Sequence, residues 1–329
     1  MLAYIVRRLF QLIIVLVGVT IITFIIMFAV PGNPARLLAG KDATPAKIAL
    51  ISHNLGLDRP LYVQYYKFVV RLLHGDLGQS YAVRQPVMQM IKQNVGNTAQ
   101  LAVAAVLIEM LGIPLGVYSA LRQYSFWDTA LTTSALVIWG IPVFVLGVFL
   151  EQFFWVTLPH WVNSWFGTMW TGLPQTPGRN IWLIFPGSWA SVGALVLPAF
   201  TLGILEVAYI SYMQRAAMLE VIRSDYIRTA RAKGLSERKV VLKHGLKNAI
   251  IPVMTIAGID LGALMGGAIV TETVFNRPGL GLMIYNAIGA RDLPVVSGGV
   301  LFATLVYVVA NLIVDIAYAY VDPRIRLGE

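Results

Sequence analysis

The feature that most constrains this chain is the run from residue 9 to residue 30, which contains no charged side chain. A helix of that length rises about 33 Å, enough to cross the hydrocarbon core of a bilayer. Arg7 and Arg8 precede the run directly. A cleaved signal peptide would have a shorter apolar core, and "VPGNP" (30–34) is a poor cleavage site, so we interpret the run as an uncleaved membrane span.

Five further apolar runs are long enough to span a membrane, near residues 98–121, 129–150, 190–213, 249–274 and 297–321. The chain is 57% hydrophobic and only 12% charged, which is too apolar for a soluble domain of 329 residues. We therefore predict an all-α membrane protein with six transmembrane helices. An even number of spans puts both termini on one side. Nine basic side chains between 215 and 247 place that side, and both termini, in the cytoplasm.

The charge and the missing motifs exclude several classes of function. A net charge of +9 in a membrane protein reflects basic loops that face anionic lipid or an acidic partner, rather than nucleic acid. Without cysteine there is no disulfide, thiolate metal site or cysteine nucleophile. The only Gly-Lys pair, Gly40-Lys41, lacks the rest of a phosphate-binding loop, and no H-E-x-x-H or G-x-S-x-G motif occurs. We expect no catalytic residue, no bound metal and no cofactor in this chain.

Four carboxylates lie in the interior of the predicted spans, away from their ends: Glu109, Glu206, Asp260 and Asp315. A charged carboxylate at the bilayer centre costs about 2.5 to 3.5 kcal/mol. These groups must therefore be protonated, hydrogen-bonded to groups such as Asn311, which is one turn from Asp315, or exposed to a water-filled cavity. Structural hydrogen bonds between helices and a polar translocation pathway both remain open.

Glycine and proline shape the predicted helices. Gly258, Gly262 and Gly266 recur every fourth residue, which predicts a smooth face that another helix approaches closely. Pro114, Pro142 and Pro198 fall inside three other spans and should kink them, because each removes a hydrogen bond from the helix. Kinked helices with interior carboxylates are typical of a transporter rather than an inert anchor.

Two segments are expected on the outer face. The first, 31–97, is too polar for the membrane, but its periodicity around 61–73 predicts short helices that lie on the outer surface. The second, 155–189, contains six of the eight tryptophans, which favours an aromatic belt at the headgroups over a lid that contacts substrate. We divide the chain into an N-terminal span with its outer segment, 1–95, and a permease domain, 96–329, whose cytoplasmic loop covers 215–250.

That cytoplasmic loop has a recognisable geometry. Residues 219–233 favour a helix whose apolar face includes Tyr226 and Ala230. Gly234 is expected just past the helix end, where the backbone turns left-handed, and Ser236 is expected to cap a second helix. The pattern predicts a helix, a glycine corner and another helix. From the spacing alone, a basic loop on lipid headgroups and a docking element for another protein remain open.

A resemblance decides between them. "DYIRTARAKGLSERKVVLKHGLKNAIIP" (225–252) resembles the cytoplasmic coupling loop of ABC-importer permeases, in the branch of the dipeptide, oligopeptide and nickel permeases. Further matches run nearly end to end: "VRRL" (6–9), "PGNP" (31–34), "HGDLGQS" (74–80), "LPA" (197–199), "RPGLG" (277–281) and "DPRIR" (322–326). The long outer segment is similar to that of the first of the two permeases in such systems. Arg228-Thr229-Ala230 replaces the wider family's Glu-Ala-Ala, Asn33 replaces a common Asp, and Pro252 is displaced.

The resemblance implies a type I ABC importer permease in a bacterial cytoplasmic membrane that moves di- and oligopeptides. The implied partners are a second permease, two ATPase subunits that use ATP and Mg, and an extracytoplasmic substrate-binding protein. Ala230 and Ala232 would enter a groove on an ATPase subunit. The residues implied to couple to the ATPase are Asp225, Tyr226, Arg228, Thr229, Ala230, Arg231, Ala232, Lys233, Gly234 and Leu235. Nickel chelates, glutathione or oligosaccharides are alternative cargoes, and an ion-coupled carrier that relays protons is a different class that also remains open.

Overall fold

The computed structural model of the chain describes residues 2–29, 34–39, 44–56, 58–169, 171–172, 180–182, 185–186 and 189–321. Its first half contains α1 (Leu2–Ala29), α2 (Pro34–Ala39), α3 (Pro45–Leu55), α4 (Leu61–Leu73), α5 (Val87–Glu109), α6 (Gly112–Leu121), α7 (Phe126–Trp139), α8 (Val143–Gln152), the π-helix η1 (Phe153–Thr157) and α9 (Leu158–Phe166). The second half contains α10 (Trp189–Ile222), α11 (Asp225–Ala232), α12 (Glu237–Lys239), the π-helix η2 (Val240–Leu246), α13 (Lys247–Ala249), α14 (Ile251–Met265), α15 (Ile269–Val274), α16 (Leu280–Gly289) and α17 (Leu293–Val321). Two short antiparallel strands, β1 (Asn180–Trp182) and β2 (Phe185–Pro186), lie before α10.

The long helix α10 is the centre of the bundle and packs against α5, α6, α7 and α8. Small residues allow this close approach. A Cβ atom on Gly112 would lie 2.7 Å from the carbonyl oxygen of Val207, and one on Gly203 would lie 2.9 Å from that of Ala105. Neither a backbone carbonyl nor the helix behind it moves easily, so glycine is required at both contacts.

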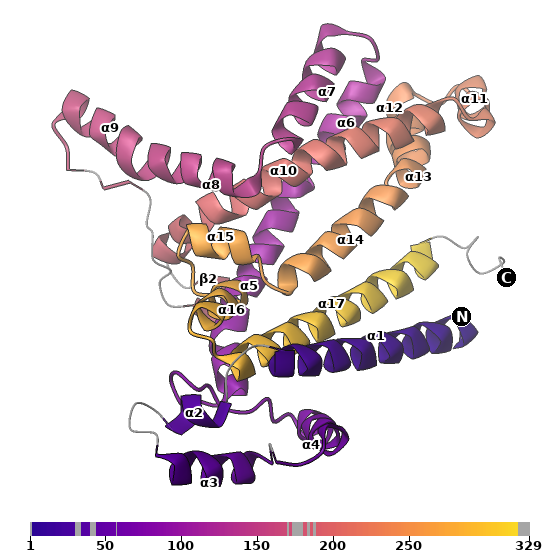
Figure 1. Ribbon diagram of the computed structural model, residues 1–329. Helices are drawn as coiled ribbons and strands as arrows, with labels where there is room; N and C mark the ends of the chain where they lie inside the picture. Colours follow the sequence, from indigo (N-terminus) through magenta and orange to yellow (C-terminus); the bar gives the residue numbers. More distant parts are fainter. Residues whose placement is uncertain are drawn as a thin grey trace.

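The predicted glycine stripe lies on α14 and faces α17. A Cβ on Gly258 would collide with the side chain of Val314, and one on Gly262 would lie 3.0 Å from the Cβ of Ala310. Gly266 is less crowded, at 3.6 Å from the Cβ of Ala303. The helix seam expected from the sequence is therefore tightest over its first two glycines. α17 also packs along α1, and Figure 1 shows that the start of α1 and the end of α17 lie on the same side of the molecule.

Among the described residues, four helices are long and apolar enough to cross a membrane: Val87–Leu121, Val143–Phe166, Val192–Ile222 and Leu293–Val314. The bent pair Glu237–Ala249 and Ile251–Met265, with 49° between its halves, makes a fifth if it is counted as one span. In α1 the described apolar stretch is shorter, Phe10–Ile26. The chain is thus an all-helical membrane protein apart from the small β1–β2 hairpin.

The predicted span 129–150 is wrong as a single helix. The backbone leaves the helix between the end of α7 and the start of α8, around Gly140 and Pro142. Proline disfavours the helical conformation in the residue before it and cannot donate to the preceding turn, so a new helix starts after Pro142. The long apolar helix of this region then continues beyond residue 150 through η1 into α9.

The other two prolines act differently. Pro114 lies just inside α6, and the boundary between α5 and α6 falls at Met110 and Leu111, about one turn before it, as expected for a helix that proline disturbs. Pro198 lies inside α10 without ending it. Of the three sites where a kink was predicted, the structure has a break at Pro142, a helix boundary near Pro114 and an uninterrupted helix at Pro198.

Among its described residues, the outer segment 31–97 contains the short helices α2, α3 and α4, and the predicted stretch 61–73 is α4. The predicted end of this outer segment is too late, because α5 already begins at Val87. α2 and α3 pack on each other, and α4 packs on α1. Figure 1 shows α2, α3 and α4 at the bottom of the view near the start of α5, whereas α11 projects at the upper right beyond the end of α10. The two ends of the molecule thus carry different elements. "PGN" (31–33) and "DPRIR" (322–326) lie outside the described residues.

Candidate functional site

The corner that follows α10 has the geometry expected from its sequence. α10 ends at Ile222, α11 begins at Asp225, and Gly234 follows α11 with φ +74°. The N–H of Gly234 donates to the carbonyl of Arg231 at 2.9 Å, and the N–H of Leu235 donates to that of Ala230 at 3.4 Å. Residues with a Cβ rarely adopt this left-handed conformation, so glycine closes the helix without strain. The predicted glycine corner is confirmed as a conformation.

Charged side chains brace the corner from outside. The Arg231 guanidinium holds both carboxylate oxygens of Glu237, at 2.7 and 3.2 Å, and this hydrogen-bonded pair lowers the pKa of Glu237 below its usual range. The Tyr226 hydroxyl accepts a hydrogen bond from the Asn248 amide at 2.8 Å. These links tie α11 to α12 and α13, so the corner is fixed by more than its backbone.

The predicted contact face of α11 needs correction. Ala230 is 7% exposed and packs with Ile227 and Val240, which are each 1% exposed. Three residues apart on a helix, Ile227 and Ala230 share the face that η2 covers, so Ala230 cannot enter a groove on a partner. The other nine residues implied by the resemblance are exposed: Asp225, Tyr226, Arg228, Thr229, Arg231, Ala232, Lys233, Gly234 and Leu235.

The expected cap at Ser236 is also wrong. Ser236 precedes α12, but its side chain makes no capping hydrogen bond. α12 has only three residues before the backbone widens into the π-helix η2. In η2, Gly245 lies against Met218 of α10: a Cβ there would be 2.8 Å from the methionine Cε atom. The second arm of the corner is therefore an irregular helix that packs back on α10.

A buried ion pair lies ten residues before α11. Arg215 of α10 donates to both oxygens of Asp128, at 2.6 and 2.8 Å. The Ser119 hydroxyl and the Tyr124 N–H donate to the same carboxylate, at 2.5 and 2.9 Å. The Arg215 guanidinium holds the pKa of Asp128 well below its usual range, against the opposite effect of burial. The pair joins the turn between α6 and α7 to α10, and no motif in the sequence points to it.

The structure brings three of the four predicted carboxylates together. Glu109, Glu206 and Asp260 lie on α5, α10 and α14, three helices that pack against one another. Glu109 is 0% exposed, and neither of its oxygens has a hydrogen-bond partner in the described part of the chain. One buried oxygen of Asp260 is in the same situation. α17 includes Asp315, but its side chain lies outside the described residues, as does any bond to Asn311.

Another buried carboxylate, Glu272 of α15, caps the start of α16. Its oxygens accept hydrogen bonds from the Thr98 hydroxyl at 2.7 Å and the Leu282 N–H at 3.0 Å. The Thr98 hydroxyl in turn accepts the Leu280 N–H at 2.8 Å. Free N–H groups at a helix start favour an anion there. A Cβ on Gly279 would overlap this carboxylate, which explains a glycine of the "RPGLG" motif.

Arg277, in the same motif, reaches across to α5 and α10. It is 2% exposed, and it donates to the Gln100 side-chain oxygen at 3.0 Å and to the Ala194 carbonyl at 3.4 Å. Ala194 lies four residues before Pro198, so its carbonyl is the one that the proline leaves without a helical partner. Arg277 replaces that missing donor, which explains how α10 tolerates the proline.

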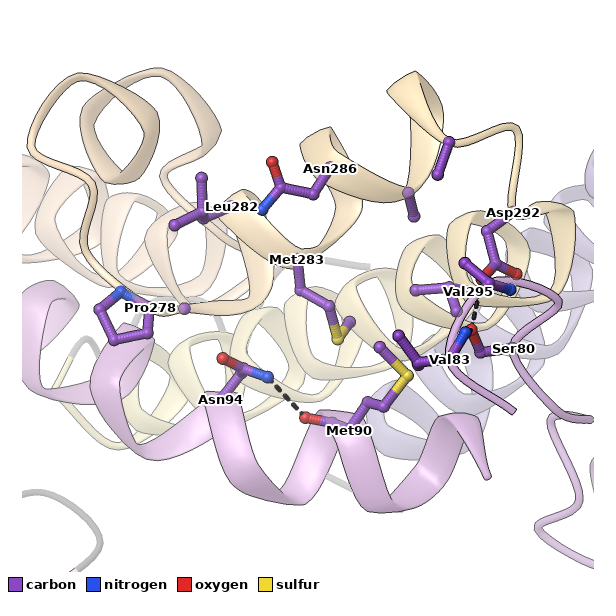
Figure 2. A pocket seen from close by; sticks show the side chains of 14 residues that line it. Ser80, Val83, Met90, Asn94, Pro278, Leu282, Met283, Asn286, Asp292 and Val295 are labelled. Carbon is purple, nitrogen blue, oxygen red and sulfur yellow. Dashed lines mark hydrogen bonds between the residues drawn. The ribbon is translucent and has the colours of Figure 1, made fainter. Parts of the chain in front are cut away.

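A pocket of about 360 Å³ lies beside the start of α16, between α5, α16 and the loop at residues 80–83. Figure 2 shows its mostly apolar lining, with the amides of Asn94 and Asn286 among Met90, Leu282 and Met283. Asp292 closes one end. It accepts hydrogen bonds from the Ser80 hydroxyl at 2.5 Å and from the N–H groups of Tyr81 and Ala82 at 3.0 and 3.1 Å, which fixes the outer loop on the start of α17.

Metal binding has little support in the described ranges, where no group of three or more histidine, aspartate or glutamate side chains is placed to hold an ion. The three central carboxylates converge without forming such a group. The structure provides three candidate sites. An exposed corner, residues 225–235, follows the end of α10. Carboxylates that lack some hydrogen-bond partners lie in the middle of the bundle, and the Glu272 carboxylate caps the start of α16 at the other end.

Comparisons with known proteins assign the chain to a family. A model described as the binding-protein-dependent transport system inner membrane component matches residues 112–327, and its N-terminal companion matches residues 1–102. The dipeptide transport system permease proteins DppB of Alkalihalophilus pseudofirmus and of Escherichia coli K12 are 41% and 38% identical, over 99% of this chain and 100% and 99% of theirs. The glutathione transport system permease protein GsiC of Salmonella paratyphi A is 38% identical over 99% of both chains.

A crystal structure of an amino acid ABC transporter aligns with 72% of this chain and 94% of its own, with a TM-score of 0.46 and 15% identity, which is too distant to decide the fold. The family models and the full-length relatives agree, without this structure, that the chain is a transport-system permease component. Because the two models together cover both parts of the chain, this protein belongs to the family of binding-protein-dependent transport system inner membrane components and is a multi-pass permease.

Proposed function

We propose that this chain is one of the two membrane-spanning subunits of an ATP-driven importer that carries di- and oligopeptides into the cytoplasm. The observation that carries the proposal is the corner at residues 225–235. It is exposed, closed by Gly234 and braced by the pair of Arg231 and Glu237. A basic loop that merely touched lipid would not need a rigid shape, whereas an element that receives mechanical work from another protein does.

The pair of Asp128 and Arg215 supports the same mechanism. Arg215 lies seven residues before the end of α10 at Ile222, about 10 Å along the helix axis. A push on the corner would therefore reach the ends of α6 and α7 together with α10, because these parts are joined by a buried bidentate ion pair. We infer that nucleotide-driven movement of an ATPase subunit shifts these helices as one body and changes access to the bundle.

The proposed partners are those that the family implies. The sequence of this chain has no phosphate-binding loop, so ATP and Mg would be used by two partner ATPases, and this chain would bind no cofactor and catalyse no reaction. A second, homologous permease and an extracytoplasmic substrate-binding protein would complete the importer. We propose six spans in the type I importer arrangement with both termini in the cytoplasm, because α1 begins and α17 ends on the side where α11 projects. The boundary between the two regions stays at residue 95 as a proposal.

Peptides are the proposed cargo because full-length relatives named as dipeptide permeases are similar over the whole chain. The relative named as a glutathione permease favours a second candidate, and glutathione is itself a tripeptide. Nickel chelates and oligosaccharides remain alternative cargoes of the same machinery. An ion-coupled carrier is distinguished by energy source: uptake that survives collapse of the proton gradient and stops on ATP depletion excludes it.

We also propose that Glu109, Glu206 and Asp260 line the translocation pathway, and the same role for Asp315 rests on the sequence alone. Unpaired oxygens on Glu109 and Asp260 support this, since a purely structural carboxylate would be expected to have a donor in the bundle. Replacing Asp260 with asparagine should lower the rate of peptide uptake without loss of the assembled protein. Unchanged uptake would remove Asp260 from the pathway.

The central experiment changes Gly234 to valine in the reconstituted transporter and measures ATP hydrolysis with and without peptide-loaded binding protein. A β-branched residue at φ +74° costs on the order of 1 to 3 kcal/mol of backbone strain, which should unwind the corner and abolish stimulation by peptide. Gly75→Val is the matched control, because Gly75 has the same φ and is equally uncrowded but lies far from the corner. Normal stimulation in Gly234→Val would refute the coupling mechanism.

A further inference from the structure

One face of α4 is fixed against α1. The Tyr65 hydroxyl shares a hydrogen bond with the Thr20 hydroxyl at 3.0 Å. The ring of Phe24 packs against the rings of Tyr65 and Phe68, with centroids 5.3 and 5.9 Å apart. Tyr65 and Phe68 are three residues apart, so they lie on one side of the helix. That side of α4 has a partner within this chain.

A second apolar face of α4 is exposed. Tyr62, Tyr66 and Leu73 are 75%, 68% and 79% exposed, and no residue of α4 is buried. At 100° per residue these three side chains fall within an arc of about 40°, roughly 110° around the helix from the face that contacts α1. Lys67 and Arg71 fall on the remaining side, about 140° from the exposed apolar face. The helix is therefore apolar on two adjacent sides and basic on the third.

The contact with α1 sets the depth of α4. Arg8 precedes the uncharged run of α1, and Phe24 lies 16 residues further on, about 24 Å along the helix. A hydrocarbon core is about 30 Å thick, so with Arg8 at the inner headgroups, Phe24 lies within the outer part of that core. Helices that lie in the membrane interface insert their apolar face about 5 to 10 Å below the headgroup boundary. α4 is held at such a depth by Phe24 and Thr20.

α1 also exposes apolar side chains at this depth. Ile21, Ile22 and Ile25 are 41%, 58% and 57% exposed. At 100° per residue they lie about 80° to 180° around α1 from the side that contacts α4 through Thr20 and Phe24. Water against such side chains would be unfavourable, and exposed apolar surface of this kind marks a lipid or protein contact. Because α4 is held beside an uncharged run of α1 that is long enough to span the hydrocarbon core, lipid is the favoured partner of its exposed face.

We propose that α4 is an interfacial helix embedded in the outer leaflet, with Tyr62, Tyr66 and Leu73 against phospholipid acyl chains and Lys67 and Arg71 extended to the headgroup phosphates. Tyrosine suits this depth because its ring is apolar and its hydroxyl reaches the headgroups. Lysine and arginine bury their stems and keep their charges in the polar layer. The helix anchors the outer segment beside the first span, whatever cargo the transporter carries.

The absence of cysteine makes a direct test simple. Single cysteines replace Tyr62, Tyr66 or Leu73, with Lys67→Cys and Arg71→Cys as controls on the same helix. Each is spin-labelled in the purified transporter complex, reconstituted in vesicles of phosphatidylcholine and phosphatidylglycerol. The measurement compares how often each label collides with oxygen, which concentrates in lipid, and with a water-soluble nickel chelate.

The expected result is a ratio of oxygen to nickel collisions several-fold higher at 62, 66 and 73 than at 67 and 71. Free nickel access at all five positions would overturn the proposal, because α4 would then lie in water. Immobilised labels at 62, 66 and 73 that neither reagent reaches would also overturn it, because another protein would cover the face. All five positions are exposed, so cysteine there leaves no internal cavity, and assembly of the complex is expected to be normal for all five.

Discussion

Replacing Asp128 with asparagine should destabilise the protein more than any equally conservative change at its surface. The side chains of Asp128 and Arg215 are 4% and 21% exposed, and the carboxylate accepts four hydrogen bonds. Asparagine keeps the size, but it removes the charge and turns an N–H donor toward the guanidinium. Breaking a buried ion pair from one side costs about 3 to 5 kcal/mol. Because Arg215 can reach water in part, we expect about 3 kcal/mol.

At about 2.1 cal/mol/K of unfolding entropy per residue, that loss corresponds to a fall in Tm of roughly 4 °C for a chain of 329 residues. The assay is thermal denaturation in detergent. Asp225→Asn is the matched control, since Asp225 is 96% exposed and pairs with an exposed Arg228 at 3.5 Å, a kind of pair that contributes little. The double variant Asp128→Asn/Arg215→Met should regain most of the Tm, because it no longer buries an unpaired charge.

The pH dependence has a definite sign. The pKa of Asp128 is lower in the folded protein than in the unfolded chain, so its stabilising effect is complete above the unfolded pKa of about 4 and is lost as the pH falls through the lower folded value. The Tm difference between the wild type and Asp128→Asn should therefore stay constant between about pH 5 and pH 8. An equal Tm for Asp128→Asn and the wild type, or a double variant as unstable as the single one, would refute the assignment of this pair as a structural joint.

Two further changes test the packing and the hydrogen bonds at the start of α16. Gly281→Ala would put a Cβ 2.6 Å from the Cα of Ile269, so it should lower the free energy of unfolding by about 1 to 3 kcal/mol, whereas Gly289→Ala in the same helix meets nothing within 4 Å and should leave the Tm unchanged or slightly higher. Thr98→Val should lower the free energy of unfolding by about 2 to 4 kcal/mol, because it removes the donor to Glu272 and the acceptor for the N–H of Leu280. Thermal denaturation measures this loss, and a loss under a tenth of that size would mean that the hydrogen-bond network is not needed for stability.

Local signals in the sequence predicted what depends on backbone chemistry alone. Gly234 marks a helix end because no other residue turns left-handed without strain, and φ +74° confirms it. The helix at 61–73 follows from periodicity, and the break at Pro142 follows from the missing N–H. These features need no knowledge of distant residues.

Features that depend on packing between distant segments were missed. Ala230 was assigned to the exterior because the covering element, η2, is an irregular helix that periodicity does not predict. Glu272 lies within the predicted span 249–274, but it was not singled out, since its partner Thr98 is 174 residues away. One signal was available: the two glycines of "RPGLG" indicate positions without room for a Cβ, and the structure shows the Glu272 carboxylate against Gly279 and the Ile269 backbone with Glu272 against Gly281.

The buried carboxylates are of two kinds: some have all their hydrogen bonds within this chain, and one lacks them. The difference shows which part of the bundle needs a hydrogen-bond donor from outside the chain. Asp128 and Glu272 have every oxygen satisfied by donors of this chain, so each is a rigid joint. Glu109 is as deeply buried, yet both of its oxygens lack a partner among the described residues. An unpaired carboxylate in a bundle is unfavourable unless it is protonated or meets a donor from outside. A second subunit, water or cargo can supply that donor, which is why we propose the middle of the bundle, rather than its joined ends, as the part of this chain on which transport acts.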